Sequence, residues 1–181
     1  MSATSAFYLR IVGAFCALAM MALSAQADIS RFTGSYSGSA EVVAADGSKV
    51  PRDMSVNISE TSDGFRVEWR SNTTRADGSV KEKSYSIDFV VSDRANVFGA
   101  AMKRNVFGHE VQLDPMKGEP YVWARIEDET LTVYSLHINA EGGYEIQQFD
   151  RTLAEDGLTL DFSSIRSGAI QRSVSTLLKR E

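Results

Sequence analysis

The sequence predicts an all-β fold, an antiparallel up-and-down β-barrel of about 8–10 strands. Apolar and polar residues alternate with period two in several segments, as in the run from Phe65 to Arg70. Asp-Gly and similar turn dipeptides separate these segments at short intervals, and the chain has only three prolines. Because consecutive strands joined by short turns must hide their edges, closure into a barrel is the expected arrangement.

The first residues, 1–27, are typical of a cleavable secretory signal peptide. Arg10 is followed by an uncharged run, Ile11 to Leu23, and then by Ala25-Gln26-Ala27, which matches an A-x-A cleavage site. The run is shorter than the roughly 20 residues that a membrane-spanning helix needs. We therefore expect residues 28–181 to form a single β-barrel domain that is periplasmic or secreted, exported from a bacterium.

The expected strands follow from the alternation and from the turns between them. In chain order they lie near 33–43, 50–60, 64–73, 80–91, 97–103, 120–127, 130–139, 143–154 and 157–166. The last segment, 169–179, is compatible with a strand and with a helix, because Ile170, Val174 and Leu178 also have helical spacing. We favour a closing strand.

Residues 92–120 interrupt the pattern. Asn96-Val97-Phe98-Gly99 recurs as Asn105-Val106-Phe107-Gly108, and Asp114-Pro115 marks a turn further on. Long ordered loops tend to be lids or binding loops, although a packed surface excursion explains this stretch equally simply. The sequence leaves its role open.

Composition excludes several classes of protein. The chain has 181 residues, of which 43% are hydrophobic, and a formal net charge of −5. These values do not suit a disordered chain, and an acidic total argues against a partner that is a nucleic acid. Charged strand faces such as Arg66-Glu68-Arg70, and the ending Lys179-Arg180-Glu181, argue against a membrane-spanning barrel.

The motifs of catalysis and metal binding are missing from the sequence. The only cysteine, Cys16, lies in the expected signal peptide, and the two histidines, His109 and His137, are far apart with no ligand motif beside them. The run Gly34–Gly38 resembles a nucleophile elbow but has Tyr36 where serine is required. We expect no catalytic residues, no metal and no cofactor.

Aromatic residues on the expected inner faces suggest a ligand cavity. A barrel of about eight strands has room for packed side chains or for one small ligand. The candidate ligand-binding residues are Tyr36, Trp69, Tyr85, Phe89, Trp123 and Arg125. The preferred function is non-catalytic binding of a small hydrophobic, lipid-like or amphipathic molecule. The alternatives are an envelope structural or interaction protein with a filled barrel that acts through loop 92–120, and an unrecognised enzyme.

Gly34-Ser35-Tyr36 opens the first expected strand at the place where lipocalins carry Gly-x-Trp. With the meander that follows, the chain resembles the calycin group, which includes lipocalins and fatty-acid-binding proteins. The resemblance implies a barrel that encloses a ligand, and a late arginine packed against the residue at position 36. Arg172 and Arg180 are both candidates for that arginine.

Overall fold

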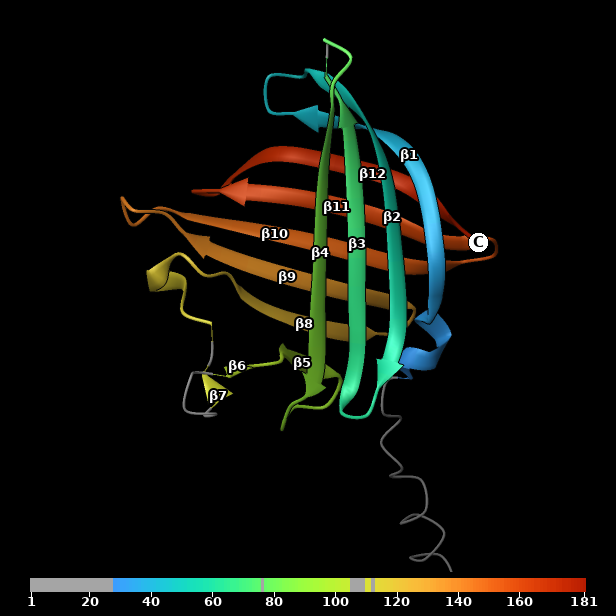
Figure 1. The fold of residues 1–181 in the computed structure, drawn as a ribbon, viewed down its shortest axis with the longest axis vertical. Helices are drawn as coiled ribbons and strands as arrows, with labels where there is room; N and C mark the ends of the chain where they lie inside the picture. The colour runs from blue at the N-terminus through green and yellow to red at the C-terminus, as the bar shows by residue number, and fades with distance from the viewer. Residues whose placement is uncertain (1–27, 76, 105–109, 112) are drawn as a thin grey trace, which may run out of the picture.

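Ten antiparallel strands form a closed barrel in the computed structural model, which describes residues 28–75, 77–104, 110–111 and 113–181 (Figure 1). The barrel strands are β1 (Gly34–Ala44), β2 (Lys49–Thr61), β3 (Gly64–Thr74), β4 (Val80–Val91), β5 (Val97–Ala100), β8 (Tyr121–Glu127), β9 (Thr130–Ile138), β10 (Tyr144–Ala154), β11 (Gly157–Arg166) and β12 (Ala169–Arg180). Their order around the barrel is β1-β12-β11-β10-β9-β8-β5-β4-β3-β2. The predicted all-β up-and-down barrel is confirmed, and 169–179 belongs to a strand. The expected signal peptide, 1–27, lies outside the described residues.

The segment 92–120 contributes one barrel strand, β5, and a small excursion. The excursion holds β6 (Lys103–Arg104), which pairs with β7 (Glu110–Val111), and the 3-10 helix η2 (Pro115–Lys117). The whole second Asn-Val-Phe-Gly run, 105–108, lies outside the described residues, as does His109. The described part of the segment does not decide between a lid and a packed loop.

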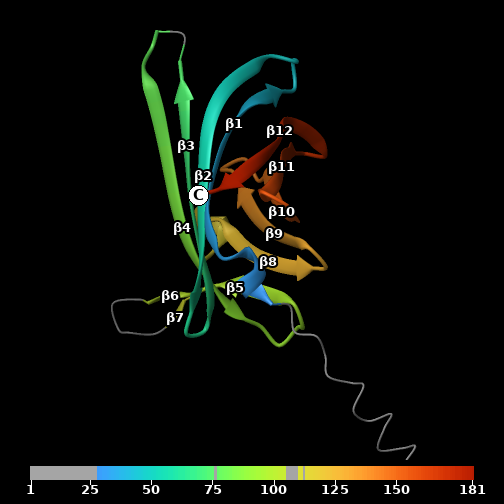
Figure 2. The ribbon, with the colours of Figure 1, turned by 90° about the vertical axis from the view of Figure 1, so that its right-hand side faces the viewer.

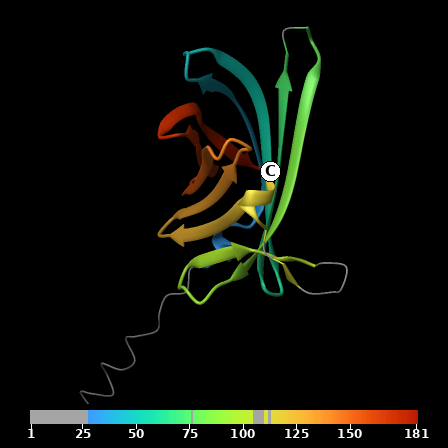
Figure 3. The ribbon, with the colours of Figure 1, turned by 90° about the vertical axis from the view of Figure 1, so that its left-hand side faces the viewer.

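Strand pairing is uneven around the barrel. β1 pairs with both β2 and β12, which closes the sheet. By contrast, β4 pairs with β5 only from Phe89 to Val91, so in the described residues the part of β4 from Val80 to Ile87 pairs with β3 alone. Figures 2 and 3 show the β3–β4 hairpin extending past the strands that face it. The barrel is thus shut at one end and flared at the other.

The shut end is filled by apolar side chains. A short 3-10 helix, η1 (Ile29–Phe32), precedes β1 and places Phe32, which is fully buried, across this end. Phe65 stacks on Phe89 with ring centroids 5.0 Å apart, and Phe98 meets Phe65 edge-on at 5.0 Å. Such burial of apolar area is the main source of stability in a domain of this size.

Hydrogen bonds of Arg180 and Tyr36 connect η1 and the residue that follows it to the barrel. The guanidinium of Arg180 lies 4.9 Å from the centre of the Tyr36 ring, donates to the Tyr36 hydroxyl at 2.6 Å and donates to the carbonyl of Thr33 at 3.0 Å. The Tyr36 hydroxyl in turn donates to the carbonyl of Phe32 at 3.0 Å. Of the two arginines left open by the calycin resemblance, Arg180 occupies the expected place. The barrel agrees with that resemblance, while membership of a family stays a prediction.

A glycine at the β10–β11 turn is required by close packing. Gly157 has φ 158°, and a Cβ at this position would overlap the carbonyl oxygen of Leu178 on β12. Gly99 in β5 has no atom within 4 Å of the corresponding position. The two residues therefore form a matched pair for substitution.

We predict that Gly157→Ala lowers the free energy of unfolding by about 2–4 kcal/mol, because the backbones of β11 and β12 must separate. Gly99→Ala should change it by less than about 0.5 kcal/mol. Urea unfolding followed by circular dichroism measures both values. Equal effects of the two substitutions would contradict the close approach at Gly157.

Candidate functional site

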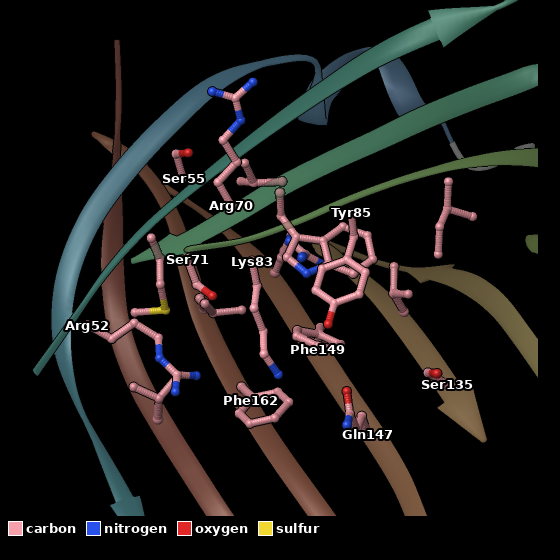
Figure 4. Close-up of a pocket in the computed structure, with 18 of the residues that line it drawn as sticks. Arg52, Ser55, Arg70, Ser71, Lys83, Tyr85, Ser135, Gln147, Phe149 and Phe162 are labelled. Carbon is pink, nitrogen blue, oxygen red and sulfur yellow. The ribbon is translucent and has the colours of Figure 1, made fainter. Parts of the chain in front are cut away.

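A cavity of about 240 Å³ occupies the half of the barrel away from η1 (Figure 4). Period-two alternation places most of its lining residues on the inner faces of the strands. The apolar and aromatic residues of the lining are Val42, Met54, Val56, Trp69, Tyr85, Ile87, Pro120, Val122, Val133, Phe149, Leu160, Phe162, Val174 and Leu178. The volume lies just below the range of about 300–1,000 Å³ typical of drug-sized ligands, so the space suits a small molecule.

Four aromatic rings form a chain across the cavity. Tyr85 stacks on Trp69 with ring centroids 5.2 Å apart. Trp69 in turn contacts Phe149 of β10, across the barrel, with centroids 5.8 Å apart. Phe149 continues to Phe162 at 4.7 Å. These four rings come from β4, β3, β10 and β11. Because the first two strands lie opposite the last two, the rings give the cavity an apolar wall on two sides.

A buried arginine lies beside this chain. Arg151 of β10 is 2% exposed, and its guanidinium carbon lies 5.5 Å from the centre of the Phe149 ring. Its Nε and Nη1 atoms are buried and have no hydrogen-bond partner. Burial lowers the pKa of Arg151 to about 10, although the nearby charge of Asp150 acts in the opposite direction. The side chain is therefore still a cation at neutral pH.

Further cations surround the cavity. Arg52, Arg70, Lys83 and Arg172 also line it, whereas its lining contains no aspartate or glutamate within the described part of the chain. Burial lowers the pKa of Arg52, and the positive charge of Arg172 lowers it further. Figure 4 shows Arg52 and Lys83 directed toward Phe162, and Arg70 directed away from it. An acidic protein thus carries a cationic cavity.

Glu145 of β10 forms ion pairs with two arginines, Arg166 and Arg172, and Arg172 is one of the residues that line the cavity. Glu145 accepts from Arg166 at 2.7 Å, from Ser164 at 2.8 Å and from Gln147 at 2.9 Å, and Arg172 lies 3.4 Å away. Burial alone would raise the pKa of Glu145, but these hydrogen bonds and the charge of Arg172 outweigh it and lower the pKa to about 2. The carboxylate is ionised throughout the physiological range.

A serine and a histidine also face the cavity. Ser135 Oγ lies 3.1 Å from His137 Nε2, and both residues line the space with Gln147. Nucleophilic catalysis would require a third group to orient the histidine and donors for an oxyanion. Within the described ranges the hydrogen bonds show neither, and no three His, Cys, Asp or Glu residues form a cluster that could hold a metal ion. These side chains can orient a ligand through hydrogen bonds.

The structure separates the six candidate residues into three groups. Trp69 and Tyr85 line the cavity. Tyr36 and Phe89 are 1% and 0% exposed in the packed half, so they support the fold and do not reach the cavity.

The third group, Trp123 and Arg125, lies on the outer face of β8. The expected inward orientation of Trp123 is wrong, because Val122, Ala124 and Ile126 are the buried residues of this strand. Trp123 stacks on Tyr134 of β9 at 4.8 Å, on the outside of the barrel. Arg125 is exposed and pairs with Glu127 at 2.8 Å, as a surface arginine does.

The sequence analysis did not predict the charged residues that line the cavity. Phe149, Arg151 and Leu153 alternate along one strand, and this spacing is the signal that could have placed Arg151 on an inner face. Arg52 and Lys83 lie near strand ends, where a charge is usually solvated, so the sequence carries no comparable signal for them.

Comparison with known proteins identifies no family. No family model matches the chain, and no curated protein matches it. The solved structure of the S-type phycobiliprotein lyase CPES from Guillardia theta matches with a TM-score of 0.38 and 10% identity over 84% of this chain and 90% of that chain. A likeness at this level carries no argument about function. In the described residues, no helix has the length and hydropathy that crossing a bilayer requires.

We predict that Glu145→Gln destabilises the protein by about 1 kcal/mol at pH 7, because it removes a charged acceptor of several hydrogen bonds. Since the pKa of Glu145 is below its ordinary value when folded, this contribution is complete above about pH 5 and is lost as the pH falls toward about 2. Urea unfolding of both proteins between pH 7 and about 2.5 measures the difference. Glu141→Gln, in an exposed turn, is the control. A difference that stays constant below about pH 4 would contradict the role of Glu145.

Proposed function

We propose that this protein binds one small apolar or amphipathic molecule in the hollow half of its barrel, without catalysing a reaction on it. The observation that carries the proposal is the cavity of about 240 Å³, which is bounded by the row of contacting aromatic rings that begins at Tyr85 and ends at Phe162. Aromatic and aliphatic walls with a few polar groups are the usual composition of a small-molecule site. An apolar body placed against these rings would leave water, which supplies the driving force for binding.

The distribution of packing within the barrel supports binding over a purely structural role. Phe32, Phe65 and Leu131 are fully buried at the end near η1. The other half contains large side chains as well, yet it retains the cavity. A scaffold that needs only stability would gain from filling this space, because each buried methylene contributes about 0.8 kcal/mol.

Export belongs to the proposal as well. The sequence pattern of residues 1–27 supports a bacterial periplasmic or extracellular location, in which a chain from Asp28 onward acts without cysteine. In such a compartment the protein would carry or sequester its ligand outside the cytoplasm.

We predict that 1-decanol changes the fluorescence of Trp69 when it binds. Trp123→Phe leaves Trp69 as the only tryptophan, and Trp123 lies outside the barrel, so the substitution should not disturb the cavity. Titration of this variant should give a saturable change in intensity or emission maximum. Native mass spectrometry of protein purified without stripping checks for a bound molecule directly. The absence of both signals would refute the proposed function.

Two further substitutions in the Trp123→Phe background locate the binding. Val174→Phe projects a larger side chain into the cavity from β12, whereas Leu177→Phe adds the same ring to the exposed side of that strand. We expect Val174→Phe to weaken the decanol response at least about tenfold, and Leu177→Phe to leave it within about twofold. Circular dichroism confirms folding of both. Equal responses would place the ligand elsewhere.

We predict that the protein expressed with its full sequence in a bacterial host is cleaved after Ala27. The intact mass of the exported protein should then equal that of residues 28–181. Ala25→Lys and Ala27→Lys, which remove the small residues of the site, should leave the chain uncut. An uncleaved wild-type chain confined to the cytoplasm would contradict export.

A further inference from the structure

We propose that the ligand carries an anionic head group, a carboxylate or an equivalent oxyanion on a small apolar body, and that Arg151 receives this head group inside the barrel. The inference rests on the proposed function, since it names the class of molecule that the cavity takes. It starts from a buried cation, Arg151, two of whose donor atoms have no hydrogen-bond partner.

The burial of Arg151 has an energetic cost. A buried guanidinium normally has hydrogen-bond acceptors for its donors, and an unpaired buried charge carries a desolvation penalty of several kcal/mol. Here Nε and Nη1 have none, and the ring of Phe149, 5.5 Å from the guanidinium carbon, supplies only a weak attraction. An oxyanion entering the cavity would supply both the acceptors and the missing charge.

The neighbouring carboxylates are already engaged. Asp150 is adjacent to Arg151 in the strand and therefore points to the opposite face. Its two oxygens accept from Thr132 and from Gln148, each at 2.7 Å. Glu145 already accepts hydrogen bonds from Arg166 and from its other donors. Neither carboxylate lines the cavity.

The charges around the cavity agree with an anionic ligand. Arg52, Lys83 and Arg172 line the same space as Arg151, and no acidic residue of the described chain does so, although the whole chain has a net charge of −5. Cavities lined by one sign of charge concentrate ligands of the other sign and accelerate their association. The cationic residues nearer the open end would attract the anion, and Arg151 would hold it.

The aromatic chain determines where the apolar body lies. Arg151 packs on Phe149, which lies between Trp69 and Phe162. A head group at Arg151 therefore places the adjoining hydrocarbon against these three rings. Arginine suits this role because its planar guanidinium matches the geometry of a carboxylate, which a lysine ammonium does not.

Three ligands with the same ten-carbon chain test the head group: decanoate, 1-decanol and decylammonium. In the Trp123→Phe protein at pH 7.5, we expect decanoate to bind at least tenfold more tightly than decanol, and decylammonium more weakly than either. Equal affinities for decanoate and decanol would overturn the anionic head group but leave the proposed function intact. Failure of all three ligands to bind, together with no bound molecule in native mass spectrometry, would refute the proposed function itself.

Arg151→Met then tests the residue. This variant should lose roughly ten- to hundred-fold in decanoate affinity, the value of a hydrogen-bonded charge pair, while decanol affinity changes by less than about threefold. Arg125→Met, on the outer face, is the matched control and should leave both affinities unchanged. If Arg52→Met abolishes the preference for decanoate and Arg151→Met retains it, the head group binds at Arg52, and the assignment to Arg151 is wrong.

Thermal unfolding supplies an independent measurement. Because Met removes an unpaired buried charge and keeps a similar volume, Arg151→Met should have a higher Tm than the wild type without ligand. Decanoate should raise the Tm of the wild type by mass action and should have little effect on the variant. A variant that unfolds at a lower temperature would show that Arg151 serves the fold, which would overturn the proposal.

Discussion

Closure of the sheet between β1 and β12 is the constraint on which the rest of the molecule depends. Pairs such as Tyr36–Arg180 and Val43–Ser173 join the first and last strands, so every strand of the barrel gains an inner and an outer face. Without this seam the hydrophobic faces of ten strands would share no enclosed interior. The Arg180–Tyr36 contact lies at one end of the seam, where it also holds η1 against the barrel.

The enclosed interior has two halves with opposite properties. Near η1 the side chains are large, apolar and packed without exposure, as Phe32 and Phe65 illustrate. Farther along the barrel, rings and cations line the same space, and β10 carries one of each in Phe149 and Arg151. The packed half supplies stability, and this surplus permits a costly buried charge in the other half. If the proposed function holds, stability and ligand recognition are assigned to different ends of the same strands.

The barrel could be predicted from the sequence because its information is local. Alternation in residues 64–73 and turns such as Asp156-Gly157 specify strands and hairpins regardless of what lies across the barrel. Even the ambiguous segment 169–179 pairs with β11 and β1, because closure needs a strand there and tertiary pairing outweighs helical spacing.

The cavity could be predicted only in part, since it depends on contacts across the barrel. In β8 both faces carry apolar residues, so alternation did not reveal that Val122 faces inward and Trp123 outward. Strand pattern likewise does not show that Tyr36 and Phe89 lie in the filled half, while Trp69 and Tyr85 lie in the hollow one. That difference follows from the curvature of the sheet and from the way opposite strands meet.

The one-sided pairing of β4 affects the dynamics of the barrel. Between Val80 and Ile87 the described strand is hydrogen-bonded to β3 alone, and Val80 and Tyr85 are exposed. Local opening of this hairpin breaks contacts with fewer neighbours than opening of β10 or β11, which are flanked on both sides. Its amides should therefore exchange with solvent deuterium faster than those of the β10–β11 pair, through fluctuations that leave the rest of the barrel folded. The ligand proposed above could then enter and leave through local opening of this hairpin, without global unfolding of the barrel.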